Sequence, residues 1–84
     1  MEKLILNDGT ELENSHVLLS GTTLWFYLNG VTFDEAYQLM SDPEKTGKIV
    51  AEYYGSTAEY FSYTDLFCLR REDDGMISGG LKHA

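Results

Sequence analysis

Hydrophobic and polar residues alternate with a period of two along most of this chain, the pattern of β-strands that bury one face. The clearest strand is 23–28 (Thr-Leu-Trp-Phe-Tyr-Leu), which carries large side chains on both sides and therefore predicts packing on both faces. The other predicted strands are bounded by turns rich in Gly, Asp, Asn and Ser. They cover residues 3–6, 11–19, 48–54, 58–63, 66–71 and 76–81.

One segment departs from this alternation. From Phe33 to Met40, apolar residues fall at i, i+3, i+4 and i+7, which predicts an amphipathic helix. Thr32 can cap its N-terminus through the hydroxyl, and Glu35 can return a hydrogen bond to the Thr32 N–H. Pro43 ends this helix and starts a single further turn that closes at the next glycine.

Antiparallel strands joined by short turns, together with one amphipathic helix, predict a single α+β domain over residues 1–84. We expect the order βββ-α-ββββ, with a mostly antiparallel sheet curled into a small barrel or a two-layer sandwich. The predicted core consists of Leu4, Leu6, Leu18, Leu24, Phe26, Leu28, Phe33, Ala36, Met40, Ile49, Ala51, Phe67, Leu69 and Ile77.

Composition narrows the class of protein. An apolar fraction of 43% with one Trp, six Tyr and four Phe is typical of a folded globular domain and excludes a disordered chain. The net charge of −8 is spread along the sequence without a basic patch, so direct binding to nucleic acid or to anionic membranes is not expected. The N-terminus lacks a signal-peptide pattern, and the single Cys68 cannot form an internal disulfide, so we expect a cytoplasmic protein.

The residues that carry catalytic or metal chemistry do not form a recognisable constellation. His16 fits a surface or edge-strand position, and His83 lies so near the C-terminus that we expect it to be frayed. Cys68 lies within an apolar strand, where a buried thiol acts as a small hydrophobe. The acidic run 72–74 lacks the calcium-loop pattern, and Gly79-Gly80 lacks the strand and helix of a phosphate loop. No enzyme, cofactor or metal site is predicted.

Aromatic residues give the best functional signal. Tyr53, Tyr54, Tyr60 and Phe61 crowd one predicted hairpin, and Trp25 lies in the strand 23–28. Cross-strand pairing inside the fold accounts for most of them. Nevertheless, so small a domain cannot bury both faces of a hairpin, and Tyr and Trp are the residue types that anchor protein interfaces. These five residues are therefore the predicted protein-contact site, which a second copy of the chain could also use.

Two alternatives remain open. The first is an acidic inhibitor that occupies the basic nucleic-acid-binding groove of a host protein. It requires convergence on one face of the carboxylates Glu52, Glu59, Asp65, Glu72, Asp73 and Asp74. The second is an enzyme, which would require His16 and Cys68 to share a cleft.

Several motifs resemble a known group of proteins. They are Leu-Asn-Asp-Gly-Thr (6–10), Thr-Leu-Trp-Phe (23–26), Thr-Phe-Asp-Glu-Ala (32–36), Ser-Asp-Pro-Glu-Lys-Thr-Gly-Lys-Ile (41–49) and Tyr-Thr-Asp-Leu (63–66). Together they resemble small uncharacterised proteins encoded in phage and prophage tail or baseplate gene neighbourhoods of Gram-positive bacteria. The resemblance implies a non-enzymatic protein that binds itself or a phage structural protein, as a minor tail component or assembly factor. It also implies a virion-associated location as the alternative to the host cytoplasm, and it supplies no functional residues.

Overall fold

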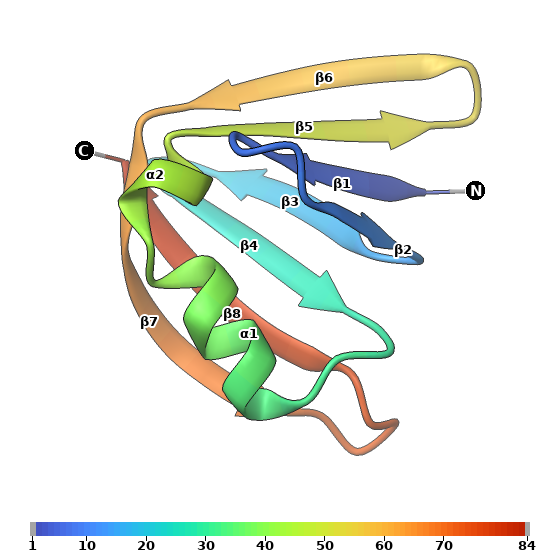
Figure 1. Cartoon of the computed structure of the whole chain (residues 1–84), viewed down its shortest axis with the longest axis vertical. Helices are drawn as coiled ribbons and strands as arrows, with labels where there is room; N and C mark the ends of the chain where they lie inside the picture. The colour runs from blue at the N-terminus through green and yellow to red at the C-terminus, as the bar shows by residue number, and fades with distance from the viewer. Residues whose placement is uncertain (1, 84) are drawn as a thin grey trace.

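The computed structural model describes residues 2–83, which form eight strands and two short helices (Figure 1). The strands are β1 (Lys3–Leu6), β2 (Glu11–Glu13), β3 (His16–Ser20), β4 (Thr23–Leu28), β5 (Lys48–Tyr53), β6 (Ser56–Phe61), β7 (Tyr63–Arg71) and β8 (Ile77–His83). The helices are α1 (Phe33–Met40) and α2 (Pro43–Thr46), and both lie between β4 and β5 in the chain.

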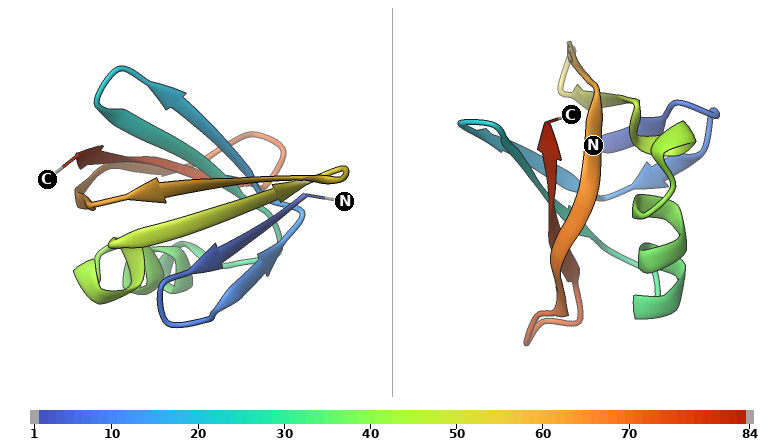
Figure 2. Two further views of the ribbon diagram at one scale, coloured as in Figure 1. Left: turned by 90° about the horizontal axis from the view of Figure 1, so that it is seen from above. Right: turned by 90° about the vertical axis from the view of Figure 1, so that its left-hand side faces the viewer.

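The strands form two four-stranded antiparallel sheets. The first sheet has the order β2-β1-β5-β6, and the second has the order β3-β4-β8-β7. The two sheets meet at the crossing between β6 and β7, where α2 lies, and α1 lies beside β7 and β8 (Figures 1 and 2). We call the side of each sheet that faces the core its inner face and the opposite side its outer face.

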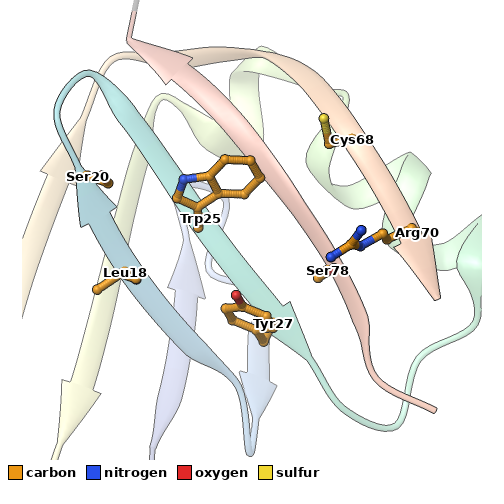
Figure 3. Close-up of a pocket in the computed structure, with 7 residues that line it drawn as sticks. All are labelled: Leu18, Ser20, Trp25, Tyr27, Cys68, Arg70 and Ser78. Atoms are coloured by element: carbon orange, nitrogen blue, oxygen red, sulfur yellow. The ribbon is translucent and has the colours of Figure 1, made fainter. Parts of the chain in front are cut away.

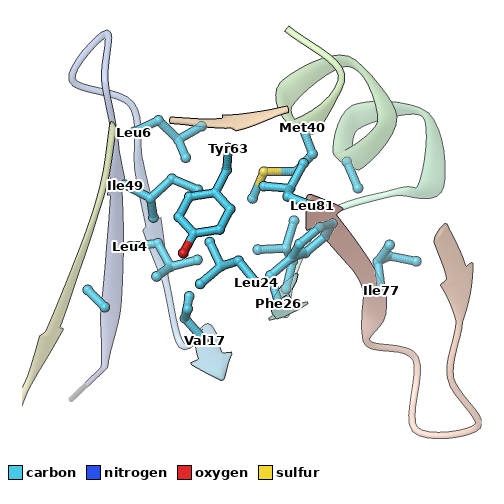
Figure 4. Close-up of a cluster of buried hydrophobic side chains, with 13 residues drawn as sticks. Leu4, Leu6, Val17, Leu24, Phe26, Met40, Ile49, Tyr63, Ile77 and Leu81 are labelled. Atoms are coloured by element: carbon cyan, nitrogen blue, oxygen red, sulfur yellow. The ribbon is translucent and has the colours of Figure 1, made fainter. Parts of the chain in front are cut away.

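The core fills the space between the two inner faces and helix α1 (Figure 4). Strand β4 illustrates how the sequence produces it, because every second side chain of β4 is buried and the alternate ones are half-buried. The buried apolar residues are Leu4, Leu6, Val17, Leu24, Phe26, Leu28, Ala36, Met40, Ile49, Ala51, Tyr63, Ile77 and Leu81. Most of the burial therefore comes from the sheet faces, with two helical residues completing it.

Helix α1 begins with the predicted capping box. The Thr32 hydroxyl accepts the Glu35 N–H at 3.1 Å, and a Glu35 carboxylate oxygen accepts the Thr32 N–H at 3.0 Å. Helix α2 begins as predicted with Pro43 in its first turn, where the Asp42 carboxylate accepts the Glu44 N–H at 3.0 Å. These local hydrogen bonds satisfy backbone donors that a helix end leaves open.

The buried hydroxyl of Thr46 connects helix α2 to the crossing between β6 and β7, where the chain leaves the first sheet and enters the second. Strands β6 and β7 are separated only by Ser62, whose φ of 62° turns the chain from the first sheet into the second. The Ser62 N–H donates to the Gly47 carbonyl at 2.7 Å, and the Thr46 hydroxyl donates to the Tyr63 carbonyl at 2.9 Å. Both bonds hold the crossing against α2.

The predicted element order requires correction. The order is ββββ-αα-ββββ, because the segment expected as one strand over 11–19 is divided into β2 and β3 by Asn14, which has a φ of 58°. The predicted turn after Pro43 is α2. The α+β class and antiparallel pairing agree with the prediction. Of the two predicted arrangements, a small barrel or a two-layer sandwich, the barrel is not found, because the described strands form two separate sheets.

Three predicted core residues lie outside the core, and a fourth, Leu69, is half-buried against it. The break at Asn14 changes the phase of β3, so Val17 pairs with inward Phe26, while Leu18 lies on the outer face and is 52% exposed. Phe33 is exposed because α1 turns Ala36 and Met40, rather than its first residue, toward the core.

Phe67, the third of these residues, is placed on the outer face by an irregularity in β7. The register of β7 against β8 shifts between Thr64 and Leu66, at the gap between the predicted strands 58–63 and 66–71. It shifts again between Phe67 and Arg70. The first bulge turns Leu66 inward and Phe67 outward, and the second returns Leu69 to the core.

Gly79 and Gly80 are required by aromatic rings on both sides of β8. A Cβ at Gly79 would lie 2.6 Å from the Phe26 ring on the inner face. A Cβ at Gly80 would lie 2.7 Å from the Phe67 ring and 3.1 Å from the Trp25 ring on the outer face. A side chain at either position would therefore displace an aromatic ring.

Candidate functional site

The five residues of the predicted contact site lie on different surfaces. Tyr53 and Tyr60 are half-buried against the core on the inner face of the first sheet. Tyr54 is 84% exposed at the β5–β6 turn, and Phe61 is 51% exposed on the outer face of the same sheet. Trp25 lies on the outer face of the second sheet. The structure therefore does not bring the five residues together. Of the five, Trp25 lines a hollow on the protein surface.

Tyr53 has a structural role. Its hydroxyl donates to the Val17 carbonyl at 3.3 Å and links β5 of the first sheet to β3 of the second. Burial raises the pKa of Tyr53 from 10.0 to about 12, and the neighbouring Tyr60 contributes to the increase. Tyr53 therefore stays a neutral donor over the physiological pH range.

A shallow hollow of about 380 Å³ lies on the outer face of the second sheet (Figure 3). All four strands of that sheet contribute to it, so residues far apart in the sequence meet there. The lining residues are Leu18, Ser20, Trp25, Tyr27, Cys68, Arg70 and Ser78. We call this surface, together with Phe67 and Lys82 beside it, the aromatic face.

The hollow follows from the sizes of the side chains around β8. Gly80 leaves room above the strand, where the Trp25 and Phe67 rings meet edge to face with centroids 5.3 Å apart. Small Ser78 follows on the same side of β8, between the larger side chains of Tyr27 and Arg70. A sheet face with large rings beside small residues presents a concave surface instead of a flat one.

Charges are arranged unevenly along the aromatic face. Glu72 accepts from Arg70 Nε at 3.1 Å and from the Ser78 hydroxyl at 2.6 Å. These two bonds, the one from Ser78 first, hold the pKa of the Glu72 carboxyl below its usual range. At the other end, Lys82 Nζ lies 5.5 Å from the centroid of the Phe67 ring and forms no ion pair with any carboxylate of the described residues. Lys82 is therefore the charge at this face that is available to a partner.

A second hollow, of about 420 Å³, continues the first toward the β7–β8 turn and shares Tyr27 and Arg70 with it. Its far end is lined by Asp73 and Asp74. The two hollows together form a groove that is apolar near Trp25 and acidic at the turn.

Residues considered for catalysis are not assembled into a site. His16 and Cys68 lie on β3 and β7, the opposite edges of the second sheet, about 14 Å apart at three strand spacings. His16 is on an exposed edge strand, as expected, and its ring contacts Glu2 at 3.2 Å. Cys68 was expected to be buried, but it is exposed because it sits in the bulge of β7 with a φ of 54°.

The expectation that His83 is frayed is wrong. It is the last residue of β8, its N–H donates to the Thr22 carbonyl at 2.9 Å, and its ring meets Tyr63 edge to face. Within residues 2–83, no group of three or more His, Cys, Asp or Glu side chains is placed to hold a metal ion. No helix of that region has the length and apolar character needed to cross a membrane.

The carboxylates invoked for an inhibitor are distributed over both sheets. Glu52 and Glu59 lie on the first sheet, where each forms an ion pair with a lysine. Residues 72–74 lie at the β7–β8 turn, at the opposite end of the molecule in Figure 1. This arrangement gives an inhibitor no single acidic face.

Comparisons with family models, with curated proteins and with solved structures give no match for this chain.

Sequence reasoning identified one member of the aromatic face, Trp25, and missed Tyr27, Phe67 and Arg70 as its neighbours. Two signals were available. The strand 23–28 has bulk on both faces, and Gly79-Gly80 marks a strand over which large side chains can lie. Neither signal shows which strands lie next to β4 and β8. The residues of the hollow could therefore be identified only from the order of the strands in the sheet.

Proposed function

We propose that this protein functions by binding another protein through the aromatic face. The observation that supports this proposal best is the hollow, in which Trp25 and Tyr27 border a concave, solvent-accessible surface on a rigid sheet. Buried aromatic anchors in such pockets dominate the binding energy of many protein interfaces.

The charges favour one class of partner segment. Lys82 lies at one end of the aromatic face, where no carboxylate of residues 2–83 forms an ion pair with it, and Asp73 and Asp74 lie at the other. A complementary segment would insert a large apolar side chain beside Trp25 and place a carboxylate near Lys82. The acidic turn would repel that carboxylate from the opposite end, which fixes the direction of the segment.

The same charges are also compatible with a second copy of the chain, because a twofold axis across the groove would set each Lys82 opposite the acidic turn of the other copy. We propose a foreign protein as the partner, with a second copy as the alternative occupant of the aromatic face.

The test uses random twelve-residue peptides displayed on yeast and selected against the complete protein. Because Trp25 is the only tryptophan, a bound peptide that enters the hollow should change its fluorescence. Affinity is then measured with a labelled peptide by fluorescence polarisation. We expect Trp25→Ala to weaken binding at least tenfold, which corresponds to about 1.4 kcal/mol, and Lys82→Glu to weaken peptides that carry a carboxylate.

Phe61→Ala is the matched control, because it removes an exposed ring from the other sheet. It should leave the affinity unchanged. Selected peptides that bind Trp25→Ala as well as they bind the unaltered protein would reject the aromatic face as the binding site.

A role as a minor phage tail component or assembly factor is a further part of this proposal, and its support is the sequence resemblance alone. Co-expression with the proteins encoded beside its gene would test it. A defined partner that is retained by the unaltered protein and by Phe61→Ala, but lost with Trp25→Ala, would support both the role and the face. Retention by all three proteins would place the contact elsewhere.

A further inference from the structure

The outward side chains of β8 run along the groove. Gly79 meets a buried ring on the inner face, whereas Gly80 meets the rings of the aromatic face, so Ser78, Gly80 and Lys82 lie on the outer face. Ser78 lines the first hollow, and Met76, just before β8, lines the second. Because a strand rises about 3.3 Å per residue, positions along β8 measure distances along the groove.

The opening for an apolar side chain lies above Ser78. The rings of Trp25 and Phe67 already cover Gly80, because even a Cβ there would lie 2.7 Å from the Phe67 ring. Ser78 is small, lies opposite Tyr27 in the register and lines the hollow together with Trp25. A partner side chain that enters at Ser78 therefore contacts both Trp25 and Tyr27, as a large apolar anchor requires.

Charges of opposite sign lie on the two sides of this opening. Lys82 is four residues from Ser78 along β8, which is about 13 Å. In the other direction, Met76 is two residues away, which is about 7 Å. The Asp74 carboxylate accepts the Met76 N–H at 3.0 Å, so the acidic turn begins at this distance, with Asp73 beside it.

The positive charge of Arg70 does not cancel the acidic turn. Arg70 Nε donates to Glu72 at 3.1 Å, so the charges of these two side chains offset each other. Asp73 and Asp74 form no ion pair with any side chain of residues 2–83. The turn therefore keeps a net negative charge that a cation of a partner can meet.

We propose that the groove binds an extended segment of a foreign protein with a defined order of side chains. The segment carries a carboxylate, a large apolar side chain four residues away, and a lysine or arginine two residues beyond it. Both spacings are even, so all three side chains lie on the same side of an extended segment, whichever way its chain runs. This inference rests on the proposed function of the aromatic face and names the class of segment that it takes.

This chain does not offer such a segment to a second copy. One stretch of the sequence has the required order, namely Asp65, Leu69 and Arg71. It lies in β7, where Leu69 packs against the core, so a second copy would have to unfold its own sheet to present it. The net charge of −8 also opposes a second copy, whereas it attracts the basic end of a foreign segment.

Synthetic nine-residue peptides on a Ser/Thr background test the spacing. The reference peptide has Glu, then Phe four residues later, then Lys two residues after Phe. Two peptides of identical composition move either Glu or Lys by one residue, which turns that charge to the other side of an extended segment. Because the peptides lack Trp, the fluorescence of Trp25 reports binding up to about 1 mM peptide.

We expect each one-residue move to raise the dissociation constant about two- to fivefold, the effect of losing one exposed ion pair. The difference between the peptides should disappear in about 1 M NaCl, where the charges are screened. Lys82→Glu should prefer a peptide with Lys in place of Glu, and Asp73→Lys should prefer one with Glu in place of Lys. Asp74 is left unaltered, because its bond to the Met76 N–H holds the turn.

Lys48→Glu is the matched control. Lys48 lies 5.6 Å from the centroid of the Phe61 ring, a contact like that of Lys82, but on the first sheet. The variant changes the net charge by the same amount as Lys82→Glu and should leave the peptide preference unchanged. Equal responses of the two variants would overturn the proposal, because net charge and not the groove would then select the peptide.

The remaining outcomes separate this inference from the proposed function. Equal affinities for all peptides, or no response to the reference peptide up to about 1 mM, would overturn the spacing. The aromatic face would still stand as the binding site if peptides selected from the random library lose affinity with Trp25→Ala. Fluorescence polarisation of a labelled peptide measures that variant, which has no tryptophan. Undiminished binding to Trp25→Ala would instead reject the face itself.

Discussion

The outer faces of the two sheets differ although the sheets share one core. On the first sheet, Lys3 bridges Glu11 at 2.8 Å and Glu52 at 3.4 Å, and Lys48 pairs with Glu59 at 3.2 Å. Cross-strand pairs of opposite charge cover this face with groups that water solvates well. It has the composition expected of a sheet side that meets only solvent.

On the second sheet, the corresponding positions carry rings. Trp25, Tyr27 and Phe67 lie across β4 and β7, with Gly80 beneath them and a hollow beside them. The core does not need this arrangement, because the inner face of the same strands is already filled by Leu24, Phe26 and Leu28. This difference is the reason that the aromatic face, and not the outer face of the first sheet, is proposed as the binding surface.

The largest loss of stability is expected from substitutions at Gly79 and Gly80, which contact aromatic rings on opposite faces of β8 and so compare the two faces directly. Gly79→Ala would place a methyl group 2.6 Å from the buried Phe26 ring, and overpacking of this kind costs about 1–3 kcal/mol. Gly80→Ala should cost less, because Phe67 and Trp25 border solvent and can move. Urea unfolding of both variants measures the difference.

The double variant Gly80→Ala/Phe67→Ala provides the control. Removing the ring that the new methyl group meets should recover part of the stability lost by Gly80→Ala alone. Equal costs for Gly79→Ala and Gly80→Ala would contradict the picture of a rigid inner face and an adaptable outer face.

A smaller effect concerns the bond that joins the two sheets. Tyr53→Phe keeps the ring but removes the donor to the Val17 carbonyl, so we expect a loss of about 1 kcal/mol near neutral pH. Thermal or urea unfolding measures this loss.

The dependence of folding stability on pH above 10 provides a second test of Tyr53. Its folded pKa of about 12 lies above the ordinary value of 10.0, so folding favours the protonated phenol. The stabilisation is fully present below pH 10 and is lost as the pH rises through 12. The unaltered protein should therefore lose stability between pH 10 and 12 more steeply than Tyr53→Phe. Parallel pH profiles would show that Tyr53 titrates alike in the folded and unfolded states.

These positions show what the sequence could and could not predict. The capping box at Thr32 and the strand at 23–28 were predictable, because local chemistry within a few residues determines them. The phase of β3 was not, because a positive φ at Asn14 exchanges Val17 for Leu18 on the core side. One residue of shift moves every side chain of a strand to the other face.

The candidate site was harder to predict than the fold, for the same reason. Its members come from β3, β4, β7 and β8, and two bulges in β7 decide that Phe67 faces outward. The aromatic-rich hairpin 53–61 attracted the sequence prediction, yet Tyr53 and Tyr60 pack inward there. In this hairpin, closely spaced aromatic residues in the sequence reflect packing against the core. The aromatic face, in contrast, forms only when strands that are distant in the sequence pair with each other.

The smallest predicted effect compares one lysine from each outer face. Lys48 Nζ lies 5.6 Å from the centroid of Phe61, and Lys82 Nζ lies 5.5 Å from that of Phe67, so both have the same aromatic contact. Among the described residues 2–83, Lys48 also pairs with a carboxylate, that of Glu59, whereas Lys82 does not. Lys48→Gln should destabilise the protein by about 0.2–1 kcal/mol at low salt, and this loss should shrink in 1 M NaCl, where charges are screened within about 3 Å. Lys82→Gln should show no such salt response in urea unfolding. If both variants respond equally to salt, then Lys82 has an intramolecular carboxylate partner in solution, and the charge assigned to a binding partner at the aromatic face is already neutralised.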